Sequence, residues 1–297
     1  MKLPSCPLCN SSQVARTFSV DDECDMFMCK KCGAGFLHPF PKNLYAEEYY
    51  LPYITSKSNL PGFIAKHIRD GRSASADWRH ISRIREIESF ICESSTGEGG
   101  RRLLDVGCGT GEFLRVAKEL RFEAWGTEIS EYARNFCRSQ FGLNVLHPDS
   151  LNELPLTFDV ITMWHILEHV EDPVKFLRMY LSKCCSGGLV VIEAPNWSSI
   201  MSKLRRKRWR FVRKDHLIYF TPDSLRYLLK SVGLRIVREK TTGSLGLTSC
   251  LERFWPHFGE FIKHHPAAIP IKSTYLNVCS ITKIGDFYRI FAIKETV

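Results

Sequence analysis

One nine-residue stretch, residues 103–111 (LLDVGCGTG), constrains the fold of this chain more than any other. Its apolar first half predicts a buried strand, and its glycines allow a tight turn and a close backbone approach to a ligand. Residues 112–120 follow with apolar positions at helical spacing. A strand, a glycine loop and a helix in this order form a nucleotide-binding corner. We therefore predict an α/β fold with a ligand at the end of this strand.

The spacing of the glycines separates two kinds of nucleotide site. A dinucleotide fingerprint reads G-x-G-x-x-G, whereas Gly107, Gly109 and Gly111 give G-x-G-x-G with Glu112 next. The following predicted strand, 123–127, ends at Glu128, about 20 residues beyond the first glycine, where an acid binds ribose hydroxyls in α/β nucleotide sites. A nicotinamide-type dinucleotide site is the alternative, and the misplaced third glycine argues against it.

DVGCGTG (105–111) followed by GTEIS (126–130) resembles the class I S-adenosylmethionine (SAM) dependent methyltransferases. LEHVEDP (167–173), the PN at 195–196 and DHLIYFTPDSL (215–225) resemble one large LEHV-type subgroup of them. The resemblance covers residues 80–240. It implies a Rossmann-like seven-stranded sheet with helices on both faces, with SAM as the cofactor. The residues expected to contact SAM are Asp105, Gly107, Cys108, Gly109, Gly111, Glu128, Ile129, Asp149, Ser150 and Trp164; for Asp149 and Ser150 a plain turn is the alternative.

The rest of the chain supplies further predicted elements. Apolar runs predict strands over 144–147, 158–163, 189–193, 234–239 and 288–293, and helical periodicity predicts helices over 73–92, 130–141 and 223–232. The last two strands are expected to be antiparallel at the sheet edge, and a turn is expected at 187–188. The helix at 73–92 is expected to cover the sheet beside the cofactor. A short aromatic helix at 44–53 and a flexible joint at 97–100 are also predicted, and 243–275 has no assignable pattern.

Four cysteines near the N-terminus have the spacing of a metal site. Cys6, Cys9, Cys29 and Cys32 form two C-x2-C pairs separated by 19 residues, which supplies the tetrahedral thiolate shell of structural Zn²⁺. Free cysteines or a redox pair are the alternatives, and Cys24 lies outside the pattern. We predict a small zinc-ribbon-like module over 1–40, a helical linker over 41–96 and a SAM-dependent methyltransferase domain over 97–297.

The composition of the chain limits the cellular location and the binding partners that are expected for it. The 12 cysteines lack the spacing of a secreted disulfide scaffold. No apolar run is long enough to span a bilayer and the N-terminus does not read as a signal peptide, so we expect a soluble, cytoplasmic protein whose oligomeric state the sequence leaves open. Much of the net charge of +9 lies in residues 203–214 (KLRRKRWRFVRK), called the basic segment below.

The basic segment has three interpretations. It binds a phosphate-bearing small molecule or glycan, because arginine suits bidentate phosphate contacts. It binds RNA, with Trp209 and Phe211 stacking on bases. Or it is a solvated face without a specific partner. The resemblance to the methyltransferases implies that Trp209 acts as a lid residue in each case.

Methyl transfer needs an acceptor in line with the S–CH3 bond and a base for its proton. His165, His169 and His216 are the candidate bases, with Glu168 beside them. His165-x-x-Glu168-His169 with a distant His216 resembles the E-x-x-E-H pattern of RNA 3′-end 2′-O-methyltransferases and some quinone-ring O-methyltransferases, in which a divalent metal holds the acceptor hydroxyls. Histidine at 165 in place of glutamate departs from that pattern. A metal site, a metal-free histidine base and purely structural histidines remain open.

These observations favour a SAM-dependent methyltransferase that acts on a small anionic metabolite, with a sugar or glycan intermediate as the preferred acceptor. An RNA methyltransferase that docks through the zinc module and the basic segment is the alternative. A scaffold that binds SAM without catalysis is a third hypothesis, and the intact glycine loop with Glu128 argues against it.

Overall fold

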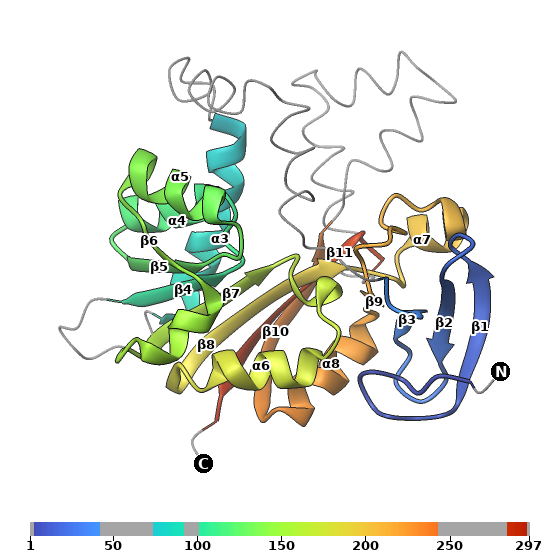
Figure 1. Ribbon diagram of the computed structural model, residues 1–297. Helices are drawn as coiled ribbons and strands as arrows, with labels where there is room; N and C mark the ends of the chain where they lie inside the picture. Colours follow the sequence, from blue (N-terminus) through green and yellow to red (C-terminus); the bar gives the residue numbers. More distant parts are fainter. Residues whose placement is uncertain (1–2, 42–73, 92–100, 243–283, 296–297) are drawn as a thin grey trace, which may run out of the picture. The chain divides into compact units, whose positions relative to one another are not determined.

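The computed structural model of the chain describes residues 3–41, 74–91, 101–242 and 284–295 (Figure 1). The elements predicted at 44–53 and 97–100, and the segment 243–275, lie outside these residues. The chain divides into two compact units. Unit 1 contains Met1–Pro41, His165–Met179 and Ile192–Ile293, and unit 2 contains Lys42–Trp164, Tyr180–Val191 and Lys294–Val297. Each unit combines segments that are distant in the sequence, and the predicted boundaries of three consecutive domains stay a prediction.

The predicted α/β architecture is confirmed by a seven-stranded sheet with the order β10-β11-β8-β7-β4-β5-β6. Its strands are β4 Arg102–Val106, β5 Glu123–Thr127, β6 Asn144–Leu146, β7 Phe158–Trp164, β8 Cys184–Pro195, β10 Leu234–Thr242 and β11 Phe287–Lys294. The described helices are α3 Ala74–Ile91, α4 Glu112–Glu119, α5 Glu131–Phe141, α6 Pro173–Leu181, α7 Ile200–Arg205 and α8 Pro222–Ser231, with short 3₁₀ turns η1 Pro148–Glu153, η2 Leu167–His169 and η3 Arg206–Arg208. In unit 2, β4 pairs in parallel with β5 and with β7.

Local sequence signals set the ends of several of these elements. Ser130 caps α5 by accepting the amide of Ala133, as its position before the helix predicts. Thr221 caps α8 in a capping box with Ser224, and Pro222 occupies the first turn. The helix α3 buries Ile84 and the apolar positions that follow it at helical spacing. Within the described ranges, no helix has the length and apolar character that a membrane crossing requires.

Two predicted boundaries are wrong. Strand β8 begins at Cys184 rather than at 189, and it continues through the predicted turn at 187–188 although Gly187 has a φ of 74°. No helix is predicted over the basic segment, yet its first half is helical in α7 and η3. Ser199 caps α7 by accepting the amide of Ser202, a signal that the density of basic residues obscured.

A second sheet lies in unit 1 and has the order β1-β2-β3-β9, and it is called the N-terminal sheet below. Its strands are β1 Val14–Ser19, β2 Asp25–Cys29, β3 Gly35–His38 and β9 Ile218–Tyr219. All three pairings are antiparallel. The fourth strand comes from a segment about 180 residues away in the sequence and has only two residues, so periodicity along the chain could not predict it.

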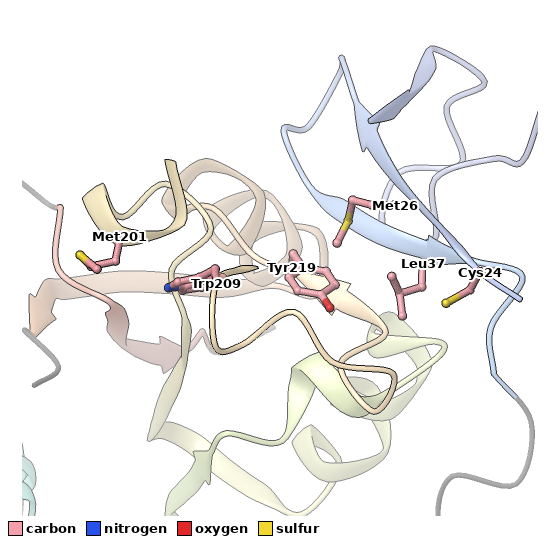
Figure 2. Close-up of a cluster of buried hydrophobic side chains, with 6 residues drawn as sticks. All are labelled: Cys24, Met26, Leu37, Met201, Trp209 and Tyr219. Carbon is pink, nitrogen blue, oxygen red and sulfur yellow. The ribbon is translucent and has the colours of Figure 1, made fainter. Parts of the chain in front are cut away.

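The N-terminal sheet shares its hydrophobic core with the basic segment (Figure 2). The buried members are Met26, Leu37 and Tyr219 from the strands of this sheet, Cys24 from its β1–β2 connection, and Met201 and Trp209 from residues 201–209. Trp209 is 2% exposed. The predictions of Trp209 as a lid and as a base-stacking residue are therefore wrong, because its ring is enclosed by this core.

We predict that Trp209→Ala lowers the free energy of unfolding by about 3–5 kcal/mol, since it removes a large buried aromatic side chain and leaves a cavity. The exposed neighbour Arg208→Ala is the matched control and should change stability by about 0.5 kcal/mol or less. Urea unfolding of both variants measures the difference. Equal midpoints for the two variants would contradict the core role of Trp209.

Candidate active site

The glycine loop is held against the end of β5 in unit 2. The amides of Gly107 and Cys108 both donate to the carbonyl of Thr127, at 2.8 and 3.0 Å. Gly109 and Gly111 have φ values of 55° and 80°, in the left-handed region that favours glycine. A side chain at 109 would meet no atom within 4 Å, whereas one at 111 would come within 2.8 Å of a side chain of α5. The loop thus packs on α5 at one glycine and leaves open space at the other.

Glu128 joins this loop to the start of α5, as its predicted position requires. One carboxylate oxygen accepts the amide of Gly109 at 3.0 Å and the other accepts the amide of Ser130 at 2.9 Å. Glu128 is 4% exposed. Arg134 donates to the carbonyls of Glu128 and Ile129, and the Ile129 side chain is exposed. The buried carboxylate therefore fixes the conformation of the glycine loop directly.

Asp105 and Cys108 lie within the core of unit 2. The carboxylate of Asp105 accepts a hydrogen bond from the Thr162 hydroxyl at 2.6 Å, which links β4 to β7. Burial raises the pKa of Asp105 to about 7. The Cys108 thiol is buried, and the neighbouring thiol of Cys137 and burial both raise its pKa.

The other predicted cofactor residues follow β6 and end β7. Asp149 lies on η1 with an exposed side chain 3.3 Å from His147, and the amide of Ser150 donates to the carbonyl of His147. The Trp164 ring meets the Phe113 ring edge-on, with centroids 5.2 Å apart.

The helix α3 also reaches the end of β7. The guanidinium of Arg83 lies 4.0 Å from the centre of the Trp164 ring, a cation–π contact. The helix itself was predicted from its periodicity. This contact connects it to Trp164, one of the residues expected to contact the cofactor.

His165, the residue after Trp164, begins a segment of unit 1 and has a φ of 60°. Its amide donates to the carbonyl of Glu193 at 2.9 Å, and η2 starts only at Leu167. His165 therefore does not lie on the helical turn that carries Glu168 and His169. Its left-handed backbone conformation separates it from the turn that carries the other two.

The imidazole of His165 lies between two buried carboxylates. Its Nδ1 is 3.5 Å from Glu168 Oε1, and its Nε2 is 3.3 Å from Glu193 Oε1. Burial alone would lower the pKa of His165, but the two carboxylates raise it to about 9. Burial would likewise raise the pKa of Glu168, and the His165 imidazolium lowers it below its usual range. His165 is thus a cation near pH 7.

Glu168, His169 and His216 form a compact group that is called the histidine cluster below. Their side-chain ligand atoms all lie within 4.8 Å of one another. Glu168 is 1% exposed, and neither of its carboxylate oxygens accepts a hydrogen bond from the part of the chain that the structure describes. The rings of His169 and His216 lie 4.7 Å apart at 82°. Three of the four predicted catalytic residues therefore meet in one place.

Hydrogen bonding assigns the tautomer of His169. Its Nδ1 lies 2.6 Å from the carbonyl oxygen of Asp215. A carbonyl only accepts, so Nδ1 carries the proton and Nε2 is the acceptor atom of the neutral ring. Burial lowers the pKa of His216 to about 4, which keeps this second imidazole neutral near pH 7.

Sequence reasoning missed Glu193, Arg289 and Phe287. Arg289 donates to Glu193 Oε2 at 2.8 and 2.6 Å, and both side chains are buried. The Phe287 ring lies 4.8 Å from the His165 ring. An acid at the end of the apolar strand 189–193 was a visible signal for Glu193. Arg289 and Phe287 had none, because their partners are distant in the sequence.

The four predicted metal-ligating cysteines meet at one end of the N-terminal sheet. The Sγ atoms of Cys6 and Cys32, and those of Cys9 and Cys29, are 3.6 Å apart, and all four lie within 4.8 Å of one another. A disulfide needs about 2.05 Å, so the cysteines are free thiols. Cys24 lies outside this cluster and packs in the shared core.

The basic segment uses its last residues within unit 1. Lys214 lies 2.7 Å from Asp21 and 2.8 Å from Glu23, both on the N-terminal sheet's β1–β2 connection. The Arg210 guanidinium lies 4.4 Å from the Phe211 ring centre. The remaining exposed cations make no ion pair with any residue of the described ranges: Lys203, Arg205, Arg206, Lys207 and Arg208.

Comparison with known families finds a match for more than half of the chain. The model of a family described as "Methyltransferase domain" matches residues 78–239. This range contains the glycine loop, Glu128 and the histidine cluster.

Two curated relatives match the same region in part. The chain is 31% identical to the ubiquinone biosynthesis O-methyltransferase of Ruegeria pomeroyi over 156 residues, which is 48% of this chain and 62% of that protein. It is 26% identical to the mitochondrial ubiquinone biosynthesis O-methyltransferase of Schizosaccharomyces pombe over 132 residues, 41% of this chain and 46% of that protein. The chain thus spans less than two thirds of the length of these relatives.

A solved structure shares the fold. The plantazolicin methyltransferase BamL, in complex with a triazolic desmethylPZN analog and SAH, gives a TM-score of 0.52 at 14% identity. The match covers 84% of this chain and 96% of that one. At this identity the likeness shows the fold alone.

We predict that the imidazoles of His165 and His216 titrate on opposite sides of neutrality, with His216 near pH 4 and His165 near pH 9. The folded-state pKa of His165 lies above its unfolded value of about 6.5. Its ion pairs therefore stabilise the fold fully below that pH, and the stabilisation is lost as the pH rises through about 9. NMR titration of ¹⁵N-histidine-labelled protein measures both groups.

Glu193→Gln is the control for this titration. It removes one of the two carboxylates, so His165 should titrate at lower pH while His216 is unchanged. An ordinary titration midpoint for His165 in the unmodified protein would contradict the ion-pair geometry.

Proposed function

We propose an acceptor and a mechanism for this chain, which belongs to the methyltransferase-domain family and is a SAM-dependent methyltransferase. The enzyme transfers the methyl group to a hydroxyl oxygen of a small-molecule acceptor, and the histidine cluster takes up the hydroxyl proton. The observation that carries this proposal is the meeting of the buried Glu168 carboxylate with the imidazoles of His169 and His216.

The glycine corner supports the cofactor part of the proposal. The open space at Gly109 allows a ligand to approach the loop backbone. Glu128 is held beside the loop by two amides, and a carboxylate at this place binds ribose hydroxyls in α/β nucleotide sites. We assign SAM to this corner, with Trp164 at the end of β7 as a further contact.

The chemistry of the acceptor follows from the tautomer of His169. As the acceptor oxygen attacks the methyl carbon, its O–H proton passes to Nε2 of His169, the S–CH3 bond breaks, and the sulfonium becomes a neutral thioether. Glu168 lies beside the ring and stabilises the imidazolium that forms. The Asp215 carbonyl keeps Nδ1 protonated, so Nε2 is the basic atom throughout.

The same three residues fit a divalent cation. Two imidazoles and a carboxylate are a common ligand set for such ions, and the Glu168 oxygens accept no hydrogen bond from the described residues. The hydrogen bond from His169 Nδ1 to a carbonyl is also the usual support for a metal-bound imidazole. A bound cation would lower the pKa of an acceptor hydroxyl.

The nature of the acceptor rests on two further observations. The matched relatives named above are O-methyltransferases of ubiquinone biosynthesis, which favours a small-molecule hydroxyl. Their names give no support to the sugar, glycan or RNA acceptors expected from the sequence, and the burial of Trp209 removes one of the two predicted base-stacking residues. Five cations between Lys203 and Arg208 form no ion pair with the described residues, and they favour an anionic small molecule.

We assign structural Zn²⁺ to Cys6, Cys9, Cys29 and Cys32. Four sulfurs within 4.8 Å of one another suit the tetrahedral thiolate shell that zinc prefers. All four ligand positions come from the protein, so this ion would stabilise the fold rather than take part in methyl transfer.

We predict that His169→Asn lowers methyl transfer from labelled SAM into the small-molecule fraction of a source-cell extract by about 10²- to 10⁴-fold, the usual contribution of a general base. SAM affinity, measured by calorimetry, should stay unchanged. Glu128→Ala is the converse control, because it should abolish SAM binding.

The outcomes of this experiment separate the alternatives. Label in the RNA or glycan fractions would overturn the small-molecule acceptor, and full activity of His169→Asn would overturn the base. Loss of activity on dialysis against a chelator, restored by Mg²⁺ but not by Zn²⁺, would assign a cation rather than His169 as the activating group.

We predict about one zinc ion per chain by elemental analysis, lost in Cys29→Ser. Cys185→Ser is the matched control, because Cys185 lies outside the four-cysteine cluster and should leave the zinc content unchanged. Protein purified without chelator that contains no zinc would contradict the assignment.

A further inference from the structure

We infer that the N-terminal sheet, closed by its four cysteines, is a positioning element of the acceptor site. In this arrangement the pairing of β3 with β9 fixes the backbone from which the histidine cluster is built. The inference rests on the proposed function of that cluster, but its test does not require methyl transfer. Every contact in the argument lies within unit 1.

The first step is the pairing of two strands from opposite ends of the sequence. Gly35 and Phe36 of β3 pair with Tyr219 and Ile218 of β9. The amide of Leu37 then donates to the carbonyl of Leu217 at 2.9 Å. The ladder therefore reaches the residue that directly follows His216.

The second step connects Leu217 to the rest of the cluster. Its amide donates to the carbonyl of Glu168 at 2.7 Å. One residue earlier in the same segment is His216, and the carbonyl of Asp215 accepts the Nδ1 proton of His169 at 2.6 Å. All three members of the cluster thus depend on the placement of residues 215–217.

The third step is that side chains hold the same segment to the N-terminal sheet. Lys214 pairs with Asp21 and Glu23 on that sheet's β1–β2 connection. Tyr219 packs against Met26 and Leu37 in the shared core (Figure 2). Residues 215–217 are therefore fixed to the sheet at both ends.

The fourth step links the cysteines to β3. Cys29 ends β2. Its amide donates to the carbonyl of Ala34, and its carbonyl accepts the amide of Gly33, in the turn that leads into β3. Cys32 lies in the same turn, and its Sγ is 3.6 Å from that of Cys6. Joining these sulfurs through a metal would fix the turn, and with it the start of β3, because metal binding and folding are coupled in such sites.

A separate docking module is the competing interpretation of this sheet. Such a module would carry its own core and would contact the rest of the chain through few residues. Here three members of the core come from β2, β3 and the turn before β2, and three come from residues 201–219. The shared core favours a positioning role.

The test uses the full chain labelled with ¹⁵N-histidine and saturated with SAM. Gly35→Val breaks the pairing without touching a cysteine, because a Cβ there would lie 3.1 Å from the Tyr219 Cβ and from the Met28 Sδ. Lys214→Glu removes the ion pairs at an exposed position. Arg16→Ala is the matched control, since it breaks an exposed pair with Asp25 inside the N-terminal sheet and far from β9 in the ladder.

We expect Gly35→Val, Lys214→Glu and zinc removal to shift or broaden the His169 Nδ1–H and His216 ring resonances. SAM affinity should change by no more than about twofold, the usual limit for sites that are independent of one another. Arg16→Ala should leave both unchanged. In Lys214→Glu, the added substitutions Asp21→Lys and Glu23→Lys should restore the histidine resonances by reversing the ion pair.

Unchanged histidine resonances in the zinc-free protein and in Gly35→Val would overturn the inference. Loss of SAM binding in both Gly35→Val and Lys214→Glu would also overturn it, because the sheet would then support the whole fold rather than the cluster. Full activity of His169→Asn refutes the proposed base alone, since the coupling measured by NMR is independent of it.

Discussion

The backbone of Leu217 is the point on which the geometry of the histidine cluster depends. Its carbonyl accepts the amide of Leu37 and its amide donates to the carbonyl of Glu168, so one peptide segment joins the N-terminal sheet to the turn η2. Buried backbone groups must be paired, which makes such a junction costly to disturb. The residues that carry the candidate chemistry lie immediately around this junction, and their geometry follows from it.

Glu128 has a comparable role in unit 2, but it acts through its side chain. Its carboxylate accepts amides from Gly109 and Ser130, so the loop and the first turn of α5 are set by one buried acid. The same group is the proposed ribose ligand. The residue that orders the loop is therefore also the one that would bind the cofactor. A single side chain would thus link the order of the loop to ligand binding.

Local sequence signals made the glycine loop and its flanking elements predictable. The contacts around the histidine cluster join residues distant in the sequence, so many of them could not be predicted. The strand at 123–127 and the helix cap at Ser130 are encoded by neighbouring residues, and the structure has both where they are expected. The meeting of Glu168, His169 and His216 was one of the alternatives that the resemblance to the E-x-x-E-H pattern left open. The pairing of β9 with β3, the burial of Trp209 and the ion pair of Glu193 with Arg289 depend on partners tens to hundreds of residues away. No periodicity in one sequence encodes such contacts.

This chain has His165 where the E-x-x-E-H pattern has a glutamate. The substitution changes the charge balance of the site, but it does not leave the site one carboxylate short. Glu193 supplies a carboxylate from β8, and its partners are His165 and Arg289. The four charged groups joined by these ion pairs, His165, Glu168, Glu193 and Arg289, sum to zero. A divalent cation would add two uncompensated charges to this buried network, which is costly. A neutral imidazole that accepts one proton adds a single charge beside Glu168 and only as the reaction proceeds. Charge balance therefore favours His169 as a base over a metal-held acceptor.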